Sequence, residues 1–329
     1  MRYENPLWQD YFADPFVLRS GEAYYAYGTG AEAIEPDRRA FRILKSLDLV
    51  SWQYVGGAVE PISGATAFWA PEVVESHGHY FLFYSAAIGA GDEFHRLRVA
   101  VSDHPEGPFI DSGQSLLSQD IFAIDAHPFC DPKTNLWYVF FATDCVADEP
   151  YGTALAVVRL KNMLSAEGEL NIILRASRDW QVYERNRNYQ SRLWPAWYTL
   201  EGPCVVYHDQ RYWCLYSGGR WSTAEYGVGF AVAEHPMGPW RDGSAAEGPV
   251  VLRGIPGQIL GPGHNSVILA PDGRSTMMVY HAWGPDMKMR RMCMDPLIWV
   301  SGGPRCDGPS TGPRVFGGVA LDALVRNGG

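Results

Sequence analysis

The stretch His79–Ala87 reads HYFLFYSAA, and it decides the fold because the chain contains four more stretches built in the same way. Each is a short run of aromatic and branched residues that ends in small or polar ones, which is typical of a buried strand. The other four are Glu22–Gly30 (EAYYAYGTG), Asn135–Thr143 (NLWYVFFAT), Arg211–Gly219 (RYWCLYSGG) and Ser275–Trp283 (STMMVYHAW). Five such runs in one chain indicate an internal repeat.

Each run is the second strand of a larger unit, because a turn and a shorter apolar strand precede it. The shorter strands are Pro15–Leu18, Pro71–Val74, Pro128–Cys130, Pro203–Val206 and Ser266–Leu269. A third strand is indicated by two nearly identical stretches, Val99–Phe109 (VAVSDHPEGPF) and Phe230–Trp240 (FAVAEHPMGPW). The units begin near residues 14, 70, 125, 201 and 264, and spacings of about 50–75 residues fit one four-stranded propeller blade each. The sequence therefore predicts an all-β chain that forms a single five-bladed β-propeller over residues 1–329.

Composition excludes several classes of partner. The formal net charge is −10 and the cationic residues are scattered, whereas nucleic acids and anionic membranes require a concentrated positive patch. No stretch reaches the roughly 18–20 apolar residues of a membrane span. The segment Met1–Pro6 lacks the pattern of a secretory signal, so a cytoplasmic location is expected. The six cysteines have no CxxC spacing, which favours buried thiols over disulfides or metal ligands, and nothing predicts an oligomeric state.

The first strand of every propeller blade lines the central channel, so residues at the start of these strands converge. Those residues are Asp14, Trp69, Asp125, Glu201 and His264. An acidic side chain that enters a buried strand is costly unless it is hydrogen-bonded or functional. A structural cap would explain any one of the three acids. Three acids at the same point of three blades favour a site instead.

Three carboxylates in one funnel suit the hydrolysis of a glycosidic bond. One carboxylate must be ionised to take a proton from water, and another must be protonated to release the leaving oxygen. Neighbouring carboxylates cannot all ionise easily, so the pKa of one is raised. A third acid can orient the general acid. Trp69 would offer a flat face to a sugar ring, with a core tryptophan as the alternative.

Four short motifs carry a resemblance to a known family. They are Ala13–Phe16 (ADPF), Trp69–Glu72 (WAPE), Ile124–Asp125 (ID) and Glu201–Pro203 (EGP). In this order and spacing they resemble glycoside hydrolase family 43, from residue 10 to about residue 300. The resemblance implies a five-bladed propeller that hydrolyses β-xylosides, α-L-arabinofuranosides, arabinan or galactans with inversion. It implies that Asp14 is the general base, Glu201 the general acid, and Asp125 the residue that orients the acid and tunes its pKa.

The resemblance also implies two binding features. His264 matches a channel histidine that binds a central calcium ion in many members, mostly through water; a histidine bonded to water alone is the alternative. Arg290 and Arg291 lie where many members place a substrate-binding arginine, with a solvated surface pair as the alternative. No organic cofactor is expected.

Two segments fall outside the repeat. Residues 179–197 are polar and aromatic without a clear period, and we interpret them as an inserted loop near the site. Within this insert, Tyr189, Trp194 and Trp197 are candidates to stack on sugars or to anchor the loop. Residues 301–329 are rich in Gly and Pro, and we expect them to close the ring or lie across it.

The leading functional hypothesis is an enzyme that releases L-arabinofuranose, or D-xylose, from the ends of oligosaccharides. A propeller that binds carbohydrate without cleaving it is the first alternative, although it would be expected to lack at least one of the acids. A related propeller enzyme is the second, acting on a galactan or a fructoside or by phosphorolysis. Phosphorolysis needs a basic cluster for the anion, and only Arg290 and Arg291 are candidates.

Overall fold

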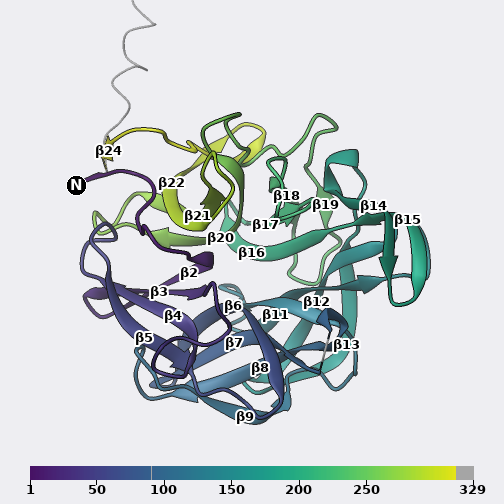
Figure 1. Ribbon diagram of the computed structural model, residues 1–329, viewed down its shortest axis with the longest axis horizontal. Helices are drawn as coiled ribbons and strands as arrows, with labels where there is room; N and C mark the ends of the chain where they lie inside the picture. Colours follow the sequence, from purple (N-terminus) through teal and green to yellow (C-terminus); the bar gives the residue numbers. More distant parts are fainter. Residues whose placement is uncertain (90, 316–329) are drawn as a thin grey trace, which may run out of the picture.

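Five sheets surround a central axis and form a five-bladed β-propeller, as predicted (Figure 1). The computed structural model describes residues 1–89 and 91–315. Within these residues the elements are almost all strands, with two short 3-10 helices, η1 (Asp92–Phe94) and η2 (Asp179–Gln181). No helix in the described part of the chain is long and apolar enough to cross a membrane.

Four of the sheets have four antiparallel strands in sequence order. The first sheet contains β2 (Ala13–Ser20), β3 (Ala23–Thr29), β4 (Ala40–Ser46) and β5 (Gln53–Val59). The second contains β6 (Ala65–Ser76), β7 (His79–Ile88), β8 (His95–Ser102) and β9 (Ile110–Ser115). The fourth contains β16 (Leu200–His208), β17 (Arg211–Gly218), β18 (Gly227–Ala233) and β19 (Arg241–Asp242). The fifth contains β20 (Leu260–Leu269), β21 (Thr276–Trp283), β22 (Arg290–Val300) and β23 (Gly303–Cys306).

The third sheet is larger because it carries the insert. Its main strands are β10 (Ala123–Cys130), β11 (Trp137–Cys145), β12 (Gly152–Asn162) and β13 (Ser165–Leu174). The insert was expected to be a loop, but it forms the hairpin of β14 (Val182–Tyr189) and β15 (Arg192–Tyr198). Both turn residues, Gln190 and Ser191, have positive φ, as a tight two-residue hairpin turn requires. The hairpin projects from the side of the propeller and joins β12 through one parallel pair, Gly152 with Tyr198 (Figure 1).

Near its two ends the described chain pairs with itself. β1 (Arg2–Tyr3) runs antiparallel to β24 (Arg314–Val315), which belongs to the segment expected to close the ring. β23, from the same segment, is the outer strand of the fifth sheet. The rest of that predicted tail, residues 316–329, lies outside the described residues.

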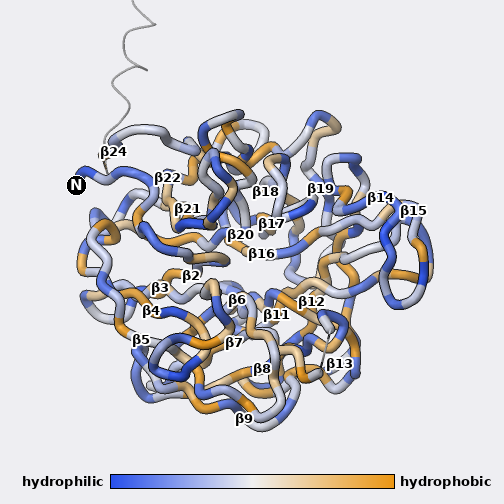
Figure 2. The backbone as a smooth tube through the Cα atoms, in the orientation of Figure 1, coloured by the Kyte–Doolittle hydropathy of each residue, from blue (hydrophilic) through white to orange (hydrophobic). Residues whose placement is uncertain are grey.

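Apolar side chains fill the space between every two neighbouring sheets. Clusters of buried residues join the first sheet to the second, the second to the third, and so on to the fifth, which packs against the first. Along β11, Tyr138 and Phe140 belong to one cluster, whereas Val139 and Phe141 belong to the next. Both faces of a second strand are therefore buried, which explains why these runs carry apolar and aromatic residues on both faces instead of on alternate positions. Hydrophobic segments recur along the blades in Figure 2.

A β-bulge interrupts the first strand of each sheet at the same point and leaves one residue there with a positive φ. These residues are Asp14 (50°), Ala70 (51°), Asp125 (60°), Gly202 (54°) and His264 (47°). Non-glycine residues rarely adopt this conformation, and where they do the strain is often part of a functional site. The structure also corrects the predicted frame of the repeat, because Trp69 and Glu201 precede the bulged residue by one position.

Candidate active site

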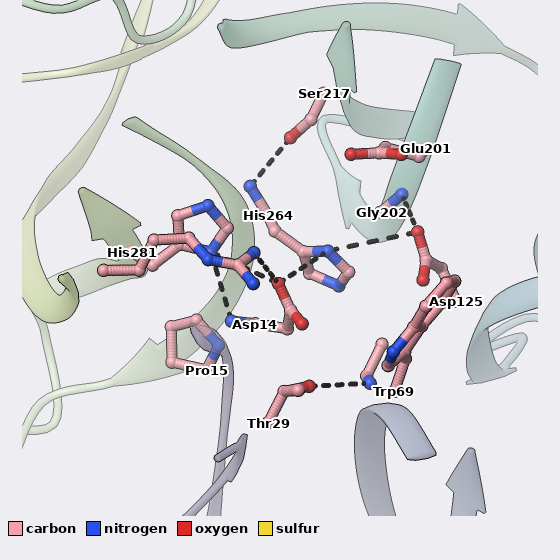
Figure 3. Close-up of polar contacts among 12 residues, drawn as sticks. Asp14, Pro15, Thr29, Trp69, Asp125, Glu201, Gly202, Ser217, His264 and His281 are labelled. Carbon is pink, nitrogen blue, oxygen red and sulfur yellow. Dashed lines mark hydrogen bonds and ion pairs between the residues drawn. The ribbon is translucent and has the colours of Figure 1, made fainter. Parts of the chain in front are cut away.

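The bulges bring predicted residues of all five blades to one cavity of about 330 Å³ in the central channel. Predicted residues that line it include Asp14, Trp69, Asp125, Glu201, His264 and Arg290. Figure 3 shows Asp14, Asp125 and Glu201 around the ring of His264. The fold therefore gathers residues that are far apart in sequence into one site.

The Asp14 carboxylate is surrounded by cationic and nitrogen-bearing groups. Its Oδ1 lies 3.3 Å from Nη1 of Arg290 and 3.4 Å from Nδ1 of His264. Burial alone would raise the pKa of Asp14, but the positive charges of His264 and Arg290 outweigh burial and hold the pKa well below its usual value. Asp14 is therefore ionised throughout the physiological pH range, as a general base must be.

The backbone at Asp14 is fixed by a neutral histidine of the neighbouring blade. His281, completely buried on β21, accepts the backbone N–H of Asp14 at Nδ1 over 3.1 Å. Burial lowers the pKa of His281 to about 4, so the ring is uncharged at neutral pH. This hydrogen bond ties the strained residue of the first blade to the fifth blade.

Arg290 is held in place before any substrate arrives. Its Nε and Nη2 both donate to the hydroxyl of Tyr11, over 2.9 and 2.5 Å. Its Cζ lies 4.4 Å from the ring centroid of Trp221, a distance typical of a cation–π contact. Arg290 is therefore paired with Asp14 and Tyr11 within the protein, and its role in binding substrate stays a prediction.

Glu201 has the opposite electrostatic environment. Burial and the nearby charge of Asp125 raise its pKa to about 7, although a hydrogen bond from the Tyr226 hydroxyl to Oε1, 2.6 Å long, acts in the other direction. A substantial fraction of Glu201 is therefore protonated near neutral pH. That state is what proton donation to a leaving group requires.

Asp125 approaches both His264 and the strand of Glu201, and its Oδ2 lies 4.0 Å from Nδ1 of His264. Its Oδ2 accepts the backbone N–H of Gly202 over 2.9 Å, which connects it to the strand that carries Glu201. Burial raises the pKa of Asp125, and the charge of His264 only partly offsets this. The pKa of His264 is itself raised, because the charges of Asp14 and Asp125 outweigh the burial that would lower it. The four groups form one coupled electrostatic cluster.

Trp69 forms a wall of the cavity and rests on a buried imidazole. Its ring lies 3.7 Å from that of His95 between centroids, at an interplanar angle of 23°. His95 is fully buried, and neither ring nitrogen has a hydrogen-bond partner among the described residues. Burial lowers the pKa of His95 to about 3. The tryptophan face is thus supported by a neutral ring.

Two residues predicted to bind substrate lie elsewhere. Arg291 follows Arg290 on β22, where side chains alternate between faces, and it lines a different cavity beside Trp283 and Cys293. Trp194 is only 3% exposed and packs against Trp197, with ring centroids 5.4 Å apart. It anchors the hairpin, which was the alternative considered for it, while Tyr189 and Trp197 do line the active-site cavity.

Several site residues had no recognised sequence signal. Tyr226 and Trp221 lie in or beside the connection between β17 and β18, whose course only the fold determines. His281 offered a usable signal, because a histidine inside the hydrophobic run TMMVYHAW needs a polar partner when it is buried. Arg187 and Asp144 line the same cavity and were not anticipated.

The expected calcium ion stays a prediction. The described residues contain no group of three or more His, Cys, Asp and Glu side chains arranged to hold a metal. Calcium prefers oxygen ligands, whereas His264 offers a nitrogen and the Asp14 carboxylate is already paired with Arg290. These residues do not form a calcium cage by themselves, and we derive no chemical step through a metal.

A channel that holds one carboxyl group with a lowered pKa and another with a raised pKa suits the base and acid of a glycoside hydrolase. Comparison with known proteins supports this class. The model of the glycosyl hydrolases family 43 matches residues 3–304. The chain therefore belongs to glycoside hydrolase family 43 and is a glycoside hydrolase.

Individual relatives differ in their substrates. The chain is 27% identical to the beta-D-galactofuranosidase xynD of Aspergillus niger, over 84% of this chain and 75% of the relative. It is also 27% identical to an extracellular exo-alpha-(1->5)-L-arabinofuranosidase of Streptomyces chartreusis, over 85% of this chain and 82% of the relative. Among solved structures, a thermostable family-43 glycoside hydrolase superposes with a TM-score of 0.82 at 30% identity, covering 95% of this chain and 98% of the other.

Proposed function

We propose that this protein is an inverting hydrolase that releases L-arabinofuranose from the ends of oligosaccharides, with D-xylose as the second candidate sugar. The observation that carries the mechanism is the opposite shift of two pKa values in one cavity, down for Asp14 and up to about 7 for Glu201. The choice of arabinofuranose is supported by the exo-acting arabinofuranosidase among the relatives. A galactofuranosidase among them supports a pocket for five-membered sugar rings.

The proposed reaction is a single displacement. Asp14 takes a proton from water while the water oxygen attacks the anomeric carbon. The bond from that carbon to the leaving oxygen breaks, and Glu201 transfers its proton to that oxygen. Asp14 ends protonated and Glu201 ionised, and exchange with solvent restores both. Water attacks from the face opposite the leaving group, so the anomeric configuration inverts.

Asp125 acts in this proposal through Glu201. Its charge helps to raise the pKa of Glu201, and its hydrogen bond to the Gly202 backbone positions the start of β16. Arg290 acts through Asp14 by keeping that carboxylate ionised. Trp69 would pack against the sugar ring, because a flat aromatic face suits the C–H groups of a sugar.

The test compares the wild type with Glu201→Ala on 4-nitrophenyl α-L-arabinofuranoside, 4-nitrophenyl β-D-xyloside and the matching oligosaccharides. A nitrophenolate leaves with little protonation, so loss of the acid should reduce hydrolysis of the oligosaccharides far more than that of the aryl glycosides. The relative rates rank the two sugars, and proton NMR of the first product gives its configuration. A wild type that turns over neither sugar, or a product of retained configuration, would contradict the proposal.

A further inference from the structure

A second arginine lines the active-site cavity and takes no part in the proposed mechanism. Arg187, on β14 of the hairpin, is surrounded by Tyr183, Tyr189 and Trp197. Its Cζ lies 4.7, 4.5 and 4.8 Å from the three ring centroids. Within residues 1–89 and 91–315 its guanidinium forms no hydrogen bond or ion pair, in contrast to the paired guanidinium of Arg290. Its N–H donors are thus available to a ligand.

A carboxyl group lies near this arginine in the same cavity. Asp144, at the end of β11, accepts a long hydrogen bond of 3.5 Å from the Tyr189 hydroxyl. Burial raises the pKa of Asp144 to about 7, and the charge of Arg187 only partly offsets this. The pair therefore combines strong donors with an acceptor that is also able to donate when protonated. This combination matches the hydroxyl groups of a neutral sugar.

The position of this pair relative to the catalytic acid indicates which part of a substrate it meets. Tyr183 lies close enough to Glu201 for the Glu201 charge to raise its pKa, after burial and against the charge of Arg187. Trp197, another ring around Arg187, lies four residues before Glu201 in the chain. The arginine also influences Asp92, an exposed residue at the rim of the cavity. Arg187 and Glu201 thus line the same cavity, and Tyr183 lies against the arginine.

We propose that Arg187 and Asp144 bind the leaving-group sugar of the oligosaccharide, with Arg187 donating to one hydroxyl and Asp144 accepting from its neighbour. This inference rests on the proposed function, in which Glu201 protonates the leaving oxygen, so the departing sugar meets the other polar groups of the same cavity. A neutral sugar fits better than a uronic acid, because the Asp92 and Asp144 carboxyls line the cavity together with the arginine and would repel an anion.

The three aromatic rings around Arg187 hold its side chain in place for binding. Stacking on three rings restricts the flexible side chain before the sugar arrives, so less rotamer freedom is lost on binding. The leaving sugar is held while its oxygen receives the proton, so this contact acts on the transition state as well as on the bound substrate. An aryl leaving group lacks these hydroxyls and would not gain from the contact.

The experiment measures kcat/KM of Arg187→Met on an oligosaccharide and on the 4-nitrophenyl glycoside of the same released sugar. Methionine keeps an apolar side chain against the rings and removes the donors. We expect a loss of about 10–100-fold on the oligosaccharide and less than about threefold on the aryl glycoside. Asp144→Ala should show the same selectivity, and Asp144→Asn should retain more oligosaccharide activity because its amide still bonds to hydroxyls.

Arg185→Met is the matched control. Arg185 is on the same strand but lines a different cavity, and its contact to Asp179 is an exposed ion pair at 3.6 Å. Its loss should leave both activities within about twofold. Equal losses on both substrates in Arg187→Met, or no loss on either, would overturn the inference. A wild type inactive on both substrates would instead overturn the proposed function itself.

Discussion

The two sides of the active-site cavity carry the same kinds of residue, a carboxyl group and an arginine, but they differ in pairing. On one side Arg290 contacts Asp14 and Tyr11, and the Asp14 pKa is depressed. On the other side Arg187 has no ion-pair partner in the described chain, and the Glu201 pKa is raised to about 7. The charge of Asp14, the proposed base, is thus fixed by groups of the protein, whereas Arg187 has donors left for a substrate.

The largest effect should come from removing the base. Asp14→Asn cannot accept a proton from water, so kcat should fall by about 10³–10⁴-fold on aryl glycosides and oligosaccharides alike. This equal loss distinguishes Asp14 from Glu201, whose removal should depend on the leaving group. Steady-state kinetics on both substrates provides the measurement, with circular dichroism as the control for folding. A variant that keeps a tenth of wild-type activity would show that Asp14 is not the base.

Asp125→Asn should move the alkaline limb of the pH–rate profile to lower pH. The reaction needs protonated Glu201, so the wild-type rate should fall as pH rises through about 7. The Asp125 charge raises the Glu201 pKa, and its removal should lower that pKa by about one unit. The rate should fall about fivefold at pH 7 and about tenfold at pH 8 and above. An unchanged alkaline limb would separate Asp125 from the titration of Glu201.

Tyr226→Phe should move the same limb in the opposite direction by a smaller amount. The tyrosine donates a hydrogen bond to the Glu201 carboxylate and so stabilises its charged form. Without this bond the Glu201 pKa should rise by about half a unit, while the rate below pH 6 changes less than about tenfold. The two variants bracket the wild type, so a pH profile that shifts the same way in both would refute this electrostatic account.

The smallest effect on activity, but a measurable one on stability, is expected at His95 beneath Trp69. The folded-state pKa of about 3 lies below the unfolded value of about 6.5, so the unfolded chain binds the proton first. The stability contributed by neutral His95 is complete above about pH 6.5 and is lost as pH falls towards 3. At pH 5 the free energy of unfolding should already be lower by about 2 kcal/mol. His95→Phe, which retains a ring against Trp69, should weaken this loss. Urea unfolding at pH 7 and pH 5 provides the measurement, and an identical pH dependence in both proteins would contradict it.

Much of the fold could be predicted because the repeated stretches of sequence are the buried core strands of the blades. The second strands are buried on both faces, so their composition stays hydrophobic and aromatic in all five blades. The acids Asp14, Asp125 and Glu201 were found from their place at the starts of the first strands, which precede the second strands in each blade. The exact frame was harder to predict, because a bulge adds a residue whose φ is positive, and Glu201 and Trp69 precede that residue.

The insert was harder to predict because its strands are stabilised by contacts made across the hairpin and with other blades. Arg187 stacks on Trp197 from the opposite strand, and Trp194 donates its indole N–H to the Tyr189 carbonyl. A sequence of charged and aromatic residues without a period gives no sign of these pairings. The same limit explains why Trp194 was considered for sugar binding although it is buried in the hairpin.

Residue types and spacings were enough to predict the five-fold repeat, the positions of the core strands and three acids at the starts of the first strands. These features depend on residue type and spacing, which burial and strand geometry constrain directly. Only the tertiary structure decided which acid is ionised, which arginine is paired and which aromatic side chains reach the cavity. Those properties depend on contacts between residues of different blades. Asp14 and His281, for example, are 267 positions apart in the sequence but form a hydrogen bond of 3.1 Å. No local pattern encodes such distances, because they arise when the ring of blades closes.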